Sequence, residues 1–512
     1  MQQAVHKRRE GSITIYLAMT LAVLLSLVLA LVESARERAL WLLADCGVDL
    51  AVYSVFAEYN RELFDAYDLL FVDTSYLTGE TGNRLLEKHL ERYIDENLSD
   101  GNTAPLITKD LTGAFLQELT IDEFSLATDG KGEIFERQAV AYMKQKYGVG
   151  YIEDLKNEFE RAKENELFTK DVASEREGNE GALAEAKKNG IDTGEVDEDG
   201  NPIMEDVEFE NPADGVNAGR SMGILNLVAP AAEVSQKGVK TETLLSKRGI
   251  QRKGDGLCGR EDAGAMKKMW FALYTCDHTG NYLHPKEDGV LAYQMEYILS
   301  GKSNDTDNLK SVTERLLLLR ETANVVYLFS DAAKVSEAEA LALSIASAAG
   351  APVLTELIKI SLLFAWAFAE SVWDVRQLLA GRRIPLMKTA ADWHFSLEGM
   401  LNYQNEGAGE TVPGQDENGG QQSAFADGMR GRLMALSEGK LGYEEYLMLF
   451  LFLEKEETVV LRMMDIAEMD VRSKSGDYGF RLEDCMDHMS ITAVVEGKLG
   501  GQRTVKRKFS YT

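Results

Sequence analysis

The stretch Ser12–Val32, SITIYLAMTLAVLLSLVLALV, decides the class of this protein. Its 21 residues carry no charge, and as a helix rising 1.5 Å per residue it extends roughly 30 Å, the thickness of a bilayer's hydrocarbon core. Lys7, Arg8 and Arg9 precede it, whereas the flank that follows has balanced charges. The positive-inside rule therefore predicts one transmembrane helix in the cell membrane, with a cytoplasmic N-terminus and the bulk of the chain outside the cytoplasm.

Two other interpretations of this stretch stay open. One is a cleavable signal peptide, but the apolar run exceeds the usual length of about 7–15 residues and no clear Ala-x-Ala site follows Val32. The other is a buried helix of a soluble protein, which is usually shorter. We expect an uncleaved anchor.

The pattern after the anchor predicts that the helix continues as an amphipathic stalk. No proline occurs from Glu33 to Phe64, and apolar residues recur at steps of three and four. These residues are Ala39, Leu42, Cys46, Leu50, Tyr53 and Ala57. We expect this face to pack on a globular head.

Patterning along the remaining chain predicts a helix-dominated α+β fold. The anchor and stalk helices lead into a mixed ectodomain that ends in a β-hairpin, indicated by alternation on either side of Gly500-Gly501. Many like charges and low hydrophobicity indicate a flexible insert before the helical region. The expected ranges are a cytoplasmic leader at 1–11, the transmembrane helix at 12–32, the stalk helix and an α+β region at 33–170, the acidic flexible insert at 171–220, a helical region at 221–404, a polar glycine-rich loop at 405–425, and helices with the C-terminal hairpin at 426–512.

A second apolar helix, predicted at 353–379, contains the string ISLLFAWAFAES. Glu356 and Lys359 interrupt its apolar character, and the uncharged run at 360–369 is too short to cross a bilayer. We expect it to be the central helix of the folded ectodomain, next to helices at 309–329 and 337–349.

The acidic composition argues against nucleic acids as partners. The net charge of −29 repels phosphate backbones, so we expect no nucleic-acid binding. A second group of cations lies near the C-terminus, at Arg503, Lys506, Arg507 and Lys508. They either guard an edge strand against aggregation or form a docking strip for an acidic neighbour or an anionic membrane.

The sequence contains no catalytic motif that we can assign. It lacks HExxH, and acid pairs such as Glu444–Glu445 are expected on solvated helix faces. The string DEDGN at 197–201 lacks the glutamate that an EF-hand needs at its twelfth position. We therefore predict no enzyme activity, no cofactor and no metal.

The four cysteines are too few for a disulfide framework. Cys258 and Cys276 are the closest pair and a candidate disulfide. Unpaired packing of both thiols is an alternative, and a zinc site with His278 and His284 is another, although the spacing matches no common zinc finger.

Particular strings resemble known families. The string Arg9-Glu10-Gly11-Ser12 before the apolar run and the string VESAR at 32–36 after it resemble the start of TadE/TadG-like pseudopilins of tight-adherence (Flp) pilus systems. The rest resembles a bacterial family, domain of unknown function 5702, associated with such pilus loci. The strings that carry this second resemblance are EYNRELFDAYDLLFVD (58–73), EYILSGKSNDTDNLKSVTERLLLLRETANVVYL (296–328), AWAFAESVWDVRQLLAGRRIPLMK (365–388) and LGYEEYLMLFLFL (441–453).

The resemblance implies a context but no chemistry. Prepilins are cut after a glycine, so Gly11–Ser12 is a candidate processing site, although Tyr16 stands where a prepilin usually has glutamate. We expect a structural or assembly protein that contacts other pilus-locus or envelope proteins. The alternatives are an extracytoplasmic hydrolase of unknown substrate and a cation-dependent adhesin or sensor.

Overall fold

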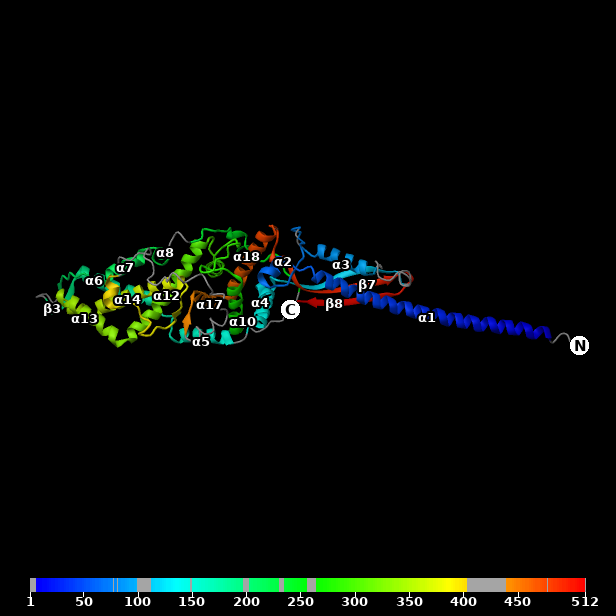
Figure 1. The fold of residues 1–512 in the computed structure, drawn as a ribbon, viewed down its shortest axis with the longest axis horizontal. Helices are drawn as coiled ribbons and strands as arrows, with labels where there is room; N and C mark the ends of the chain where they lie inside the picture. The colour runs from blue at the N-terminus through cyan, green and yellow to red at the C-terminus, as the bar shows by residue number, and fades with distance from the viewer. Residues whose placement is uncertain are drawn as a thin grey trace, which may run out of the picture. The chain divides into compact units, whose positions relative to one another are not determined.

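The structure, a computed structural model, divides the chain into two compact units (Figure 1). It describes residues 6–511 apart from 77, 81, 99–111, 148–149, 197–201, 230–233, 256–263, 403–438 and 477. Unit 1 comprises Met1–Gln138, Ile250–Arg260 and Ala467–Thr512, and unit 2 comprises Ala139–Gly249 and Glu261–Ile466. Neither unit is one continuous stretch of sequence. The predicted helix-dominated α+β class, with its long N-terminal helix and C-terminal hairpin, is confirmed.

Unit 1 combines a long helix with an antiparallel sheet. Its elements are α1 (His6–Phe56), α2 (Arg61–Tyr67), β1 (Val72–Asp73), α3 (Arg84–Leu98), β2 (Ala114–Leu126), the start of α4 (Asp129–Lys146), the end of α18 (Glu456–Ser475), η6 (Leu482–Asp484), β7 (Cys485–Gly497) and β8 (Gln502–Ser510). In the sheet, β7 pairs with β2 along one side and with β8 and the short β1 along the other. Ile121 faces Ile491, and Ala493 faces Val505. The two ends of the chain therefore build one sheet.

The outer half of α1 packs on this sheet, but with a different face from the one that we predicted. The buried residues of α1 pack with α3, β7 and β8 in one apolar core; they are Leu40, Ala44, Val48, Ala51, Val52, Val55 and Phe56. The predicted stripe, from Ala39 to Ala57, is exposed instead. Both stripes have steps of three and four, so periodicity alone could not select between them. Gly47 explains part of the outcome, because a Cβ there would lie only 3.3 Å from Leu98 of α3.

Unit 2 consists mainly of helices. Its elements are the end of α4, α5 (Gly150–Glu164), α6 (Val172–Asn189), β3 (Ile191–Val196), β4 (Pro202–Glu205), α7 (Ala213–Ala218), η1 (Gly219–Ser221), α8 (Ile224–Val228), η3 (Thr241–Thr243), α9 (Leu245–Arg248), α10 (Ala265–His278), α11 (Gln294–Ser300), α12 (Asp305–Ser330), α13 (Ala332–Ala348), η4 (Pro352–Leu354), α14 (Thr355–Leu379), β5 (Ile384–Pro385), α15 (Leu397–Asn402), β6 (Lys440–Leu441), α17 (Tyr443–Leu453) and the start of α18. Helix α14 contacts α6, α7, α8, α12 and α13. Most of its apolar window is buried, which favours the predicted core helix over a second membrane span.

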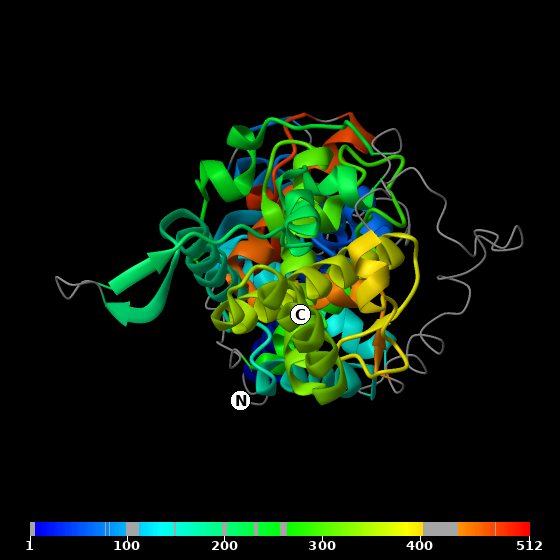
Figure 2. The same ribbon diagram turned by 90° about the vertical axis from the view of Figure 1, so that its left-hand side faces the viewer.

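Two local expectations differ from the structure. The range 171–220, expected to be a flexible insert, contains α6, the β3–β4 hairpin that projects sideways in Figure 2, and α7. The buried Val172 and Leu183 of α6 supply an apolar face that the acidic composition concealed. Glu444 and Glu445, expected on a solvated face, are buried in α17. The predicted glycine-rich loop at 405–425 and the DEDGN string lie outside the described residues.

Candidate functional site

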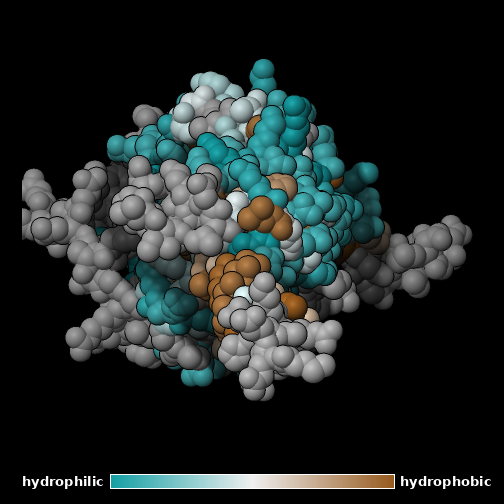
Figure 3. All heavy atoms as spheres, turned by 90° about the vertical axis from the view of Figure 1, so that its right-hand side faces the viewer, coloured by the Kyte–Doolittle hydropathy of each residue, from teal (hydrophilic) through white to brown (hydrophobic). Residues whose placement is uncertain are grey.

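The N-terminal half of α1 is an apolar helical segment that the other described residues leave uncovered. From Ile13 to Ala35 every side chain is exposed except Thr20, which is half-buried. The hydroxyls of Thr20 and Ser26 donate to carbonyl oxygens one turn earlier, at 2.9 Å to Leu17 and 2.8 Å to Val23. A helix whose backbone and hydroxyl groups are satisfied internally suits a lipid environment. Figure 3 views this end of the chain and shows hydrophobic side chains gathered there.

The exposed stripe continues this apolar surface along the outer half of α1. We use this name for Ala39, Leu42, Cys46, Leu50, Tyr53 and Ala57. Leu42 is 66% exposed, Leu50 53% and Tyr53 59%. Each of these side chains exposes apolar area to water, and removing that area from water by a contact would be favourable. The stripe is therefore a candidate contact surface.

The opposite face of α1 is fixed to β8 by charge as well as by apolar packing. Arg503 lies 3.1 Å from Asp45, and Arg507 pairs with Asp49 and with Asp45 at 3.5 Å. Lys506 and Lys508 point to the other side of the strand and are exposed. Among the described strands, β8 pairs only with β7, so these cations lie on an edge strand, where charge discourages further pairing.

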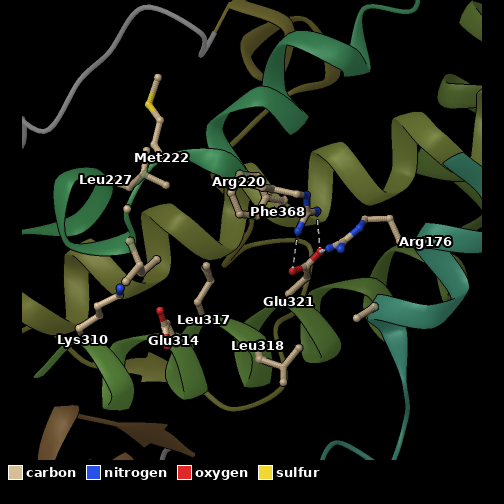
Figure 4. Close-up of a pocket in the computed structure, with 13 residues that line it drawn as sticks. Arg176, Arg220, Met222, Leu227, Lys310, Glu314, Leu317, Leu318, Glu321 and Phe368 are labelled. Atoms are coloured by element: carbon tan, nitrogen blue, oxygen red, sulfur yellow. Dashed lines mark hydrogen bonds and ion pairs between the residues drawn. The ribbon is translucent and has the colours of Figure 1, made fainter. Parts of the chain in front are cut away.

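A cavity of about 420 Å³ lies in unit 2 between α6, α8, α12 and α14 (Figure 4). Arg220 donates to both carboxylate oxygens of Glu321, at 3.0 and 2.6 Å, and its guanidinium lies 3.9 Å from the ring centre of Phe368. Arg176 approaches the same carboxylate at 3.8 Å. The other lining residues are Ala173, Met222, Gly223, Ile224, Leu227, Lys310, Glu314, Leu317 and Leu318. The polar groups that line the cavity are thus the charged side chains of Arg176, Arg220, Lys310, Glu314 and Glu321.

The deepest charged groups of unit 2 form a network around Arg320. Its guanidinium donates to Asp374 at 3.1 and 2.8 Å and to the Tyr446 hydroxyl at 2.9 Å. Lys388 pairs with Asp374 at 2.6 Å and also with Glu370. Both acids and the arginine are fully buried. A buried charge needs such partners, and these pairs link α12 and α14 to the segment that carries Lys388.

The sequence model described as "Family of unknown function (DUF5702)" matches residues 203–497, more than half of the chain. The chain belongs to this family. Searches of curated proteins and of solved structures find no match. The DUF5702 match includes the cavity residues from Arg220 to Phe368 and strand β7, whereas α1, β2 and Arg176 lie outside it.

The structure brings together part of the set that we considered for zinc. The Cys276 thiol lies 4.0 Å from Glu444, and the His284 Nδ1 lies 3.0 Å from the same carboxylate. His278 instead has its Nδ1 3.0 Å from the carbonyl oxygen of Tyr274. Among the described residues of this DUF5702 chain, no three ligand-type side chains have metal-binding geometry. Cys258 lies outside the described residues, so the disulfide with Cys276 stays a prediction.

The processing site that we predicted stays untested, and the buried network around Arg320 was not predicted. Gly11 and Ser12 lie inside α1, and their cleavage stays a prediction. The buried Arg320 network was missed altogether. Charges within apolar strings, such as the arginine in LLLLRETANVV (316–326) and the acids in AWAFAESVWDV (365–375), were the available signal. A charged residue at a core position of a helix needs a buried partner.

Proposed function

We propose that this DUF5702 protein is a non-enzymatic envelope protein. In this proposal α1 anchors it in the cell membrane, and it assembles there with neighbouring membrane-anchored helices, as a pseudopilin-like component of a pilus locus. The observation that carries the proposal is the division of α1 into a bare apolar half and an outer half covered on one face only. Such a helix can cross lipid with the first half and contact a partner helix with the exposed stripe.

Several features support this orientation and mode of action. The cations at Lys7, Arg8 and Arg9 favour a cytoplasmic N-terminus. The uninterrupted continuation of α1 into the core of unit 1 favours retention of the anchor over cleavage as a signal peptide, because cleavage near Val32 would separate the sheet from the membrane. The buried charges around Arg320 pair with one another, which fits a structural role for that network.

Site-specific photocrosslinking in intact membranes tests the assembly contact. A benzophenone amino acid is placed on the exposed stripe at Leu42 or Leu50, and a matched control carries it at Lys506 on β8. We expect discrete adducts from both stripe positions, with a second copy of this chain or with another single-span envelope protein identified by mass spectrometry. Stripe positions that give only monomer, or only the adducts seen from Lys506, would remove the assembly role.

A further inference from the structure

The turn between β7 and β8 lies at the level of α1 where the bare apolar half ends. From residue 13 onward, where burial in α1 is described, Arg36 is the first buried residue, with a side chain only 6% exposed. Its Nη2 donates to the carbonyl oxygens of Leu499, at 3.0 Å, and Gly500, at 3.2 Å. The same guanidinium pairs with Glu33 at 2.5 Å. One arginine thus ties the hairpin turn to the helix.

The turn is held in this place by its own backbone and by both neighbouring elements. Gly500 and Gly501 have φ angles of +92° and +95°, which side chains other than glycine rarely adopt. Gly497 N–H donates to the Gly501 carbonyl at 3.0 Å, and Lys498 N–H donates to the Gly113 carbonyl at 3.2 Å. A Cβ on Gly501 would lie 3.3 Å from Leu40 of α1. The turn therefore cannot swing away from α1 without losing these contacts.

What the turn presents to its surroundings is an aliphatic side chain next to a cation. Leu499 is 73% exposed, and Lys498 is also exposed. This combination suits the boundary between water and lipid, where an apolar side chain reaches the acyl region and an ammonium stays among the phosphates.

The distance along α1 places the turn at that boundary. Arg36 follows Val32, the last residue of the uncharged run, by four residues, about 6 Å of helix. The polar headgroup layer on each side of the hydrocarbon core is roughly 5–7 Å thick. The carbonyls that Arg36 holds therefore lie within this layer whenever residues 12–32 span the core.

We propose that the turn Lys498–Gly501 is a second membrane contact, with Leu499 inserted at the lipid headgroup level and Lys498 facing lipid phosphates. The inference rests on the proposed membrane anchoring of α1. A helix alone leaves the attached domain free to rotate and tilt, whereas a second contact at the surface restricts both motions. The sheet of unit 1, and with it the exposed stripe, would then meet partners in a fixed orientation.

The test measures immersion depth in the full chain reconstituted in vesicles of equal parts phosphatidylcholine and phosphatidylglycerol. A nitroxide is attached through a bio-orthogonal amino acid at Leu499, at Val23 in the anchor, or at the exposed Lys508, which lies about 23 Å further along β8 from the turn. Power saturation then compares accessibility to oxygen and to a water-soluble nickel chelate. We expect the label at Leu499 to lose nickel accessibility relative to Lys508, while Val23 is protected most.

The outcomes separate this inference from the proposed function. If Val23 is protected but Leu499 is as accessible to nickel as Lys508, the turn does not contact lipid and the anchor stands. If Val23 itself is accessible to nickel, the anchor fails and the turn contact fails with it. Lys498→Glu should reduce the protection of Leu499 in these anionic vesicles and leave it unchanged in phosphatidylcholine alone. Equal protection with and without the substitution would overturn the role of Lys498.

Discussion

Glu296, on α11 in unit 2, is a carboxyl group buried among aromatic side chains. Its Oε1 accepts hydrogen bonds from the Tyr443 hydroxyl, at 2.8 Å, and from the Tyr282 N–H, at 2.9 Å. Burial raises the pKa of Glu296 from an ordinary value of 4.5 to about 7, because the charged form loses its hydration. The folded chain therefore keeps a proton in a pH range where the unfolded chain has released it.

This residue makes stability fall as pH rises. Between pH 4.5 and 7 the folded state binds more protons at Glu296, so the free energy of unfolding decreases through this window, by roughly 3 kcal/mol from this group. Glu296→Gln should flatten the pH dependence of the unfolding midpoint between pH 5 and about 7.5. Urea unfolding followed at several pH values measures it, with the exposed Glu314→Gln as the matched control. Parallel profiles for wild type and Glu296→Gln would contradict the expectation.

At the scale of elements, α1 has two opposite apolar faces, of which one is buried and the other is exposed. Leu40 is 2% exposed and belongs to the core that joins α1 to the sheet. Leu42, two residues later, is 66% exposed on the stripe. The first face stabilises unit 1, whereas the second is exposed and is the face that we propose to contact a partner.

The same substitution on the two faces should have different consequences. Leu40→Ala removes buried methyl groups and leaves a cavity, so we expect a loss of about 2–5 kcal/mol in the free energy of unfolding. Leu42→Ala should change it by less than about 0.5 kcal/mol in detergent-solubilised monomer. Chemical unfolding of the two variants in the same detergent measures both values. Equal losses would show that the stripe also belongs to the core.

For the molecule as a whole, the number of membrane spans depends on whether each of its two apolar helices buries its surface in protein or exposes it. Within the described part of the chain, residues 13–35 of α1 are exposed except for the half-buried Thr20, whereas residues along α14 such as Trp366 are buried. A helix covered by its own protein gains nothing from lipid, since its apolar surface is already removed from water. One span is therefore expected.

Deletion of residues 12–32 should convert the chain to a soluble protein. We expect the truncated chain to leave the membrane pellet entirely after a carbonate wash and to keep its helical circular dichroism without detergent. The full-length chain, expressed in parallel, should stay in the pellet. Retention of the truncated chain in washed membranes would indicate that α14 spans the bilayer as well.

The local sequence pattern was sufficient to predict those elements whose formation depends on neighbouring residues alone. The uncharged run Ser12–Val32 predicts a long apolar helix, which α1 contains, and its role as a membrane anchor stays a prediction. The C-terminal hairpin follows from alternation around Gly500-Gly501, and the helices near 309–329 and 353–379 from their own apolar content. The strings at 296–328 and 365–388 were also sufficient by themselves to indicate the family, because a family resemblance depends on the residues within each string.

Tertiary structure alone decided which surfaces are buried. Steps of three and four occur on both faces of α1, and only the sheet completed by residues 485–510 selects Leu40 over Leu42. Glu296 and Glu444 look like ordinary acids in a chain with a net charge of −29, yet distant elements enclose them. The physical reason is that burial depends on contacts between residues far apart in the chain, which the spacing within one helix cannot express.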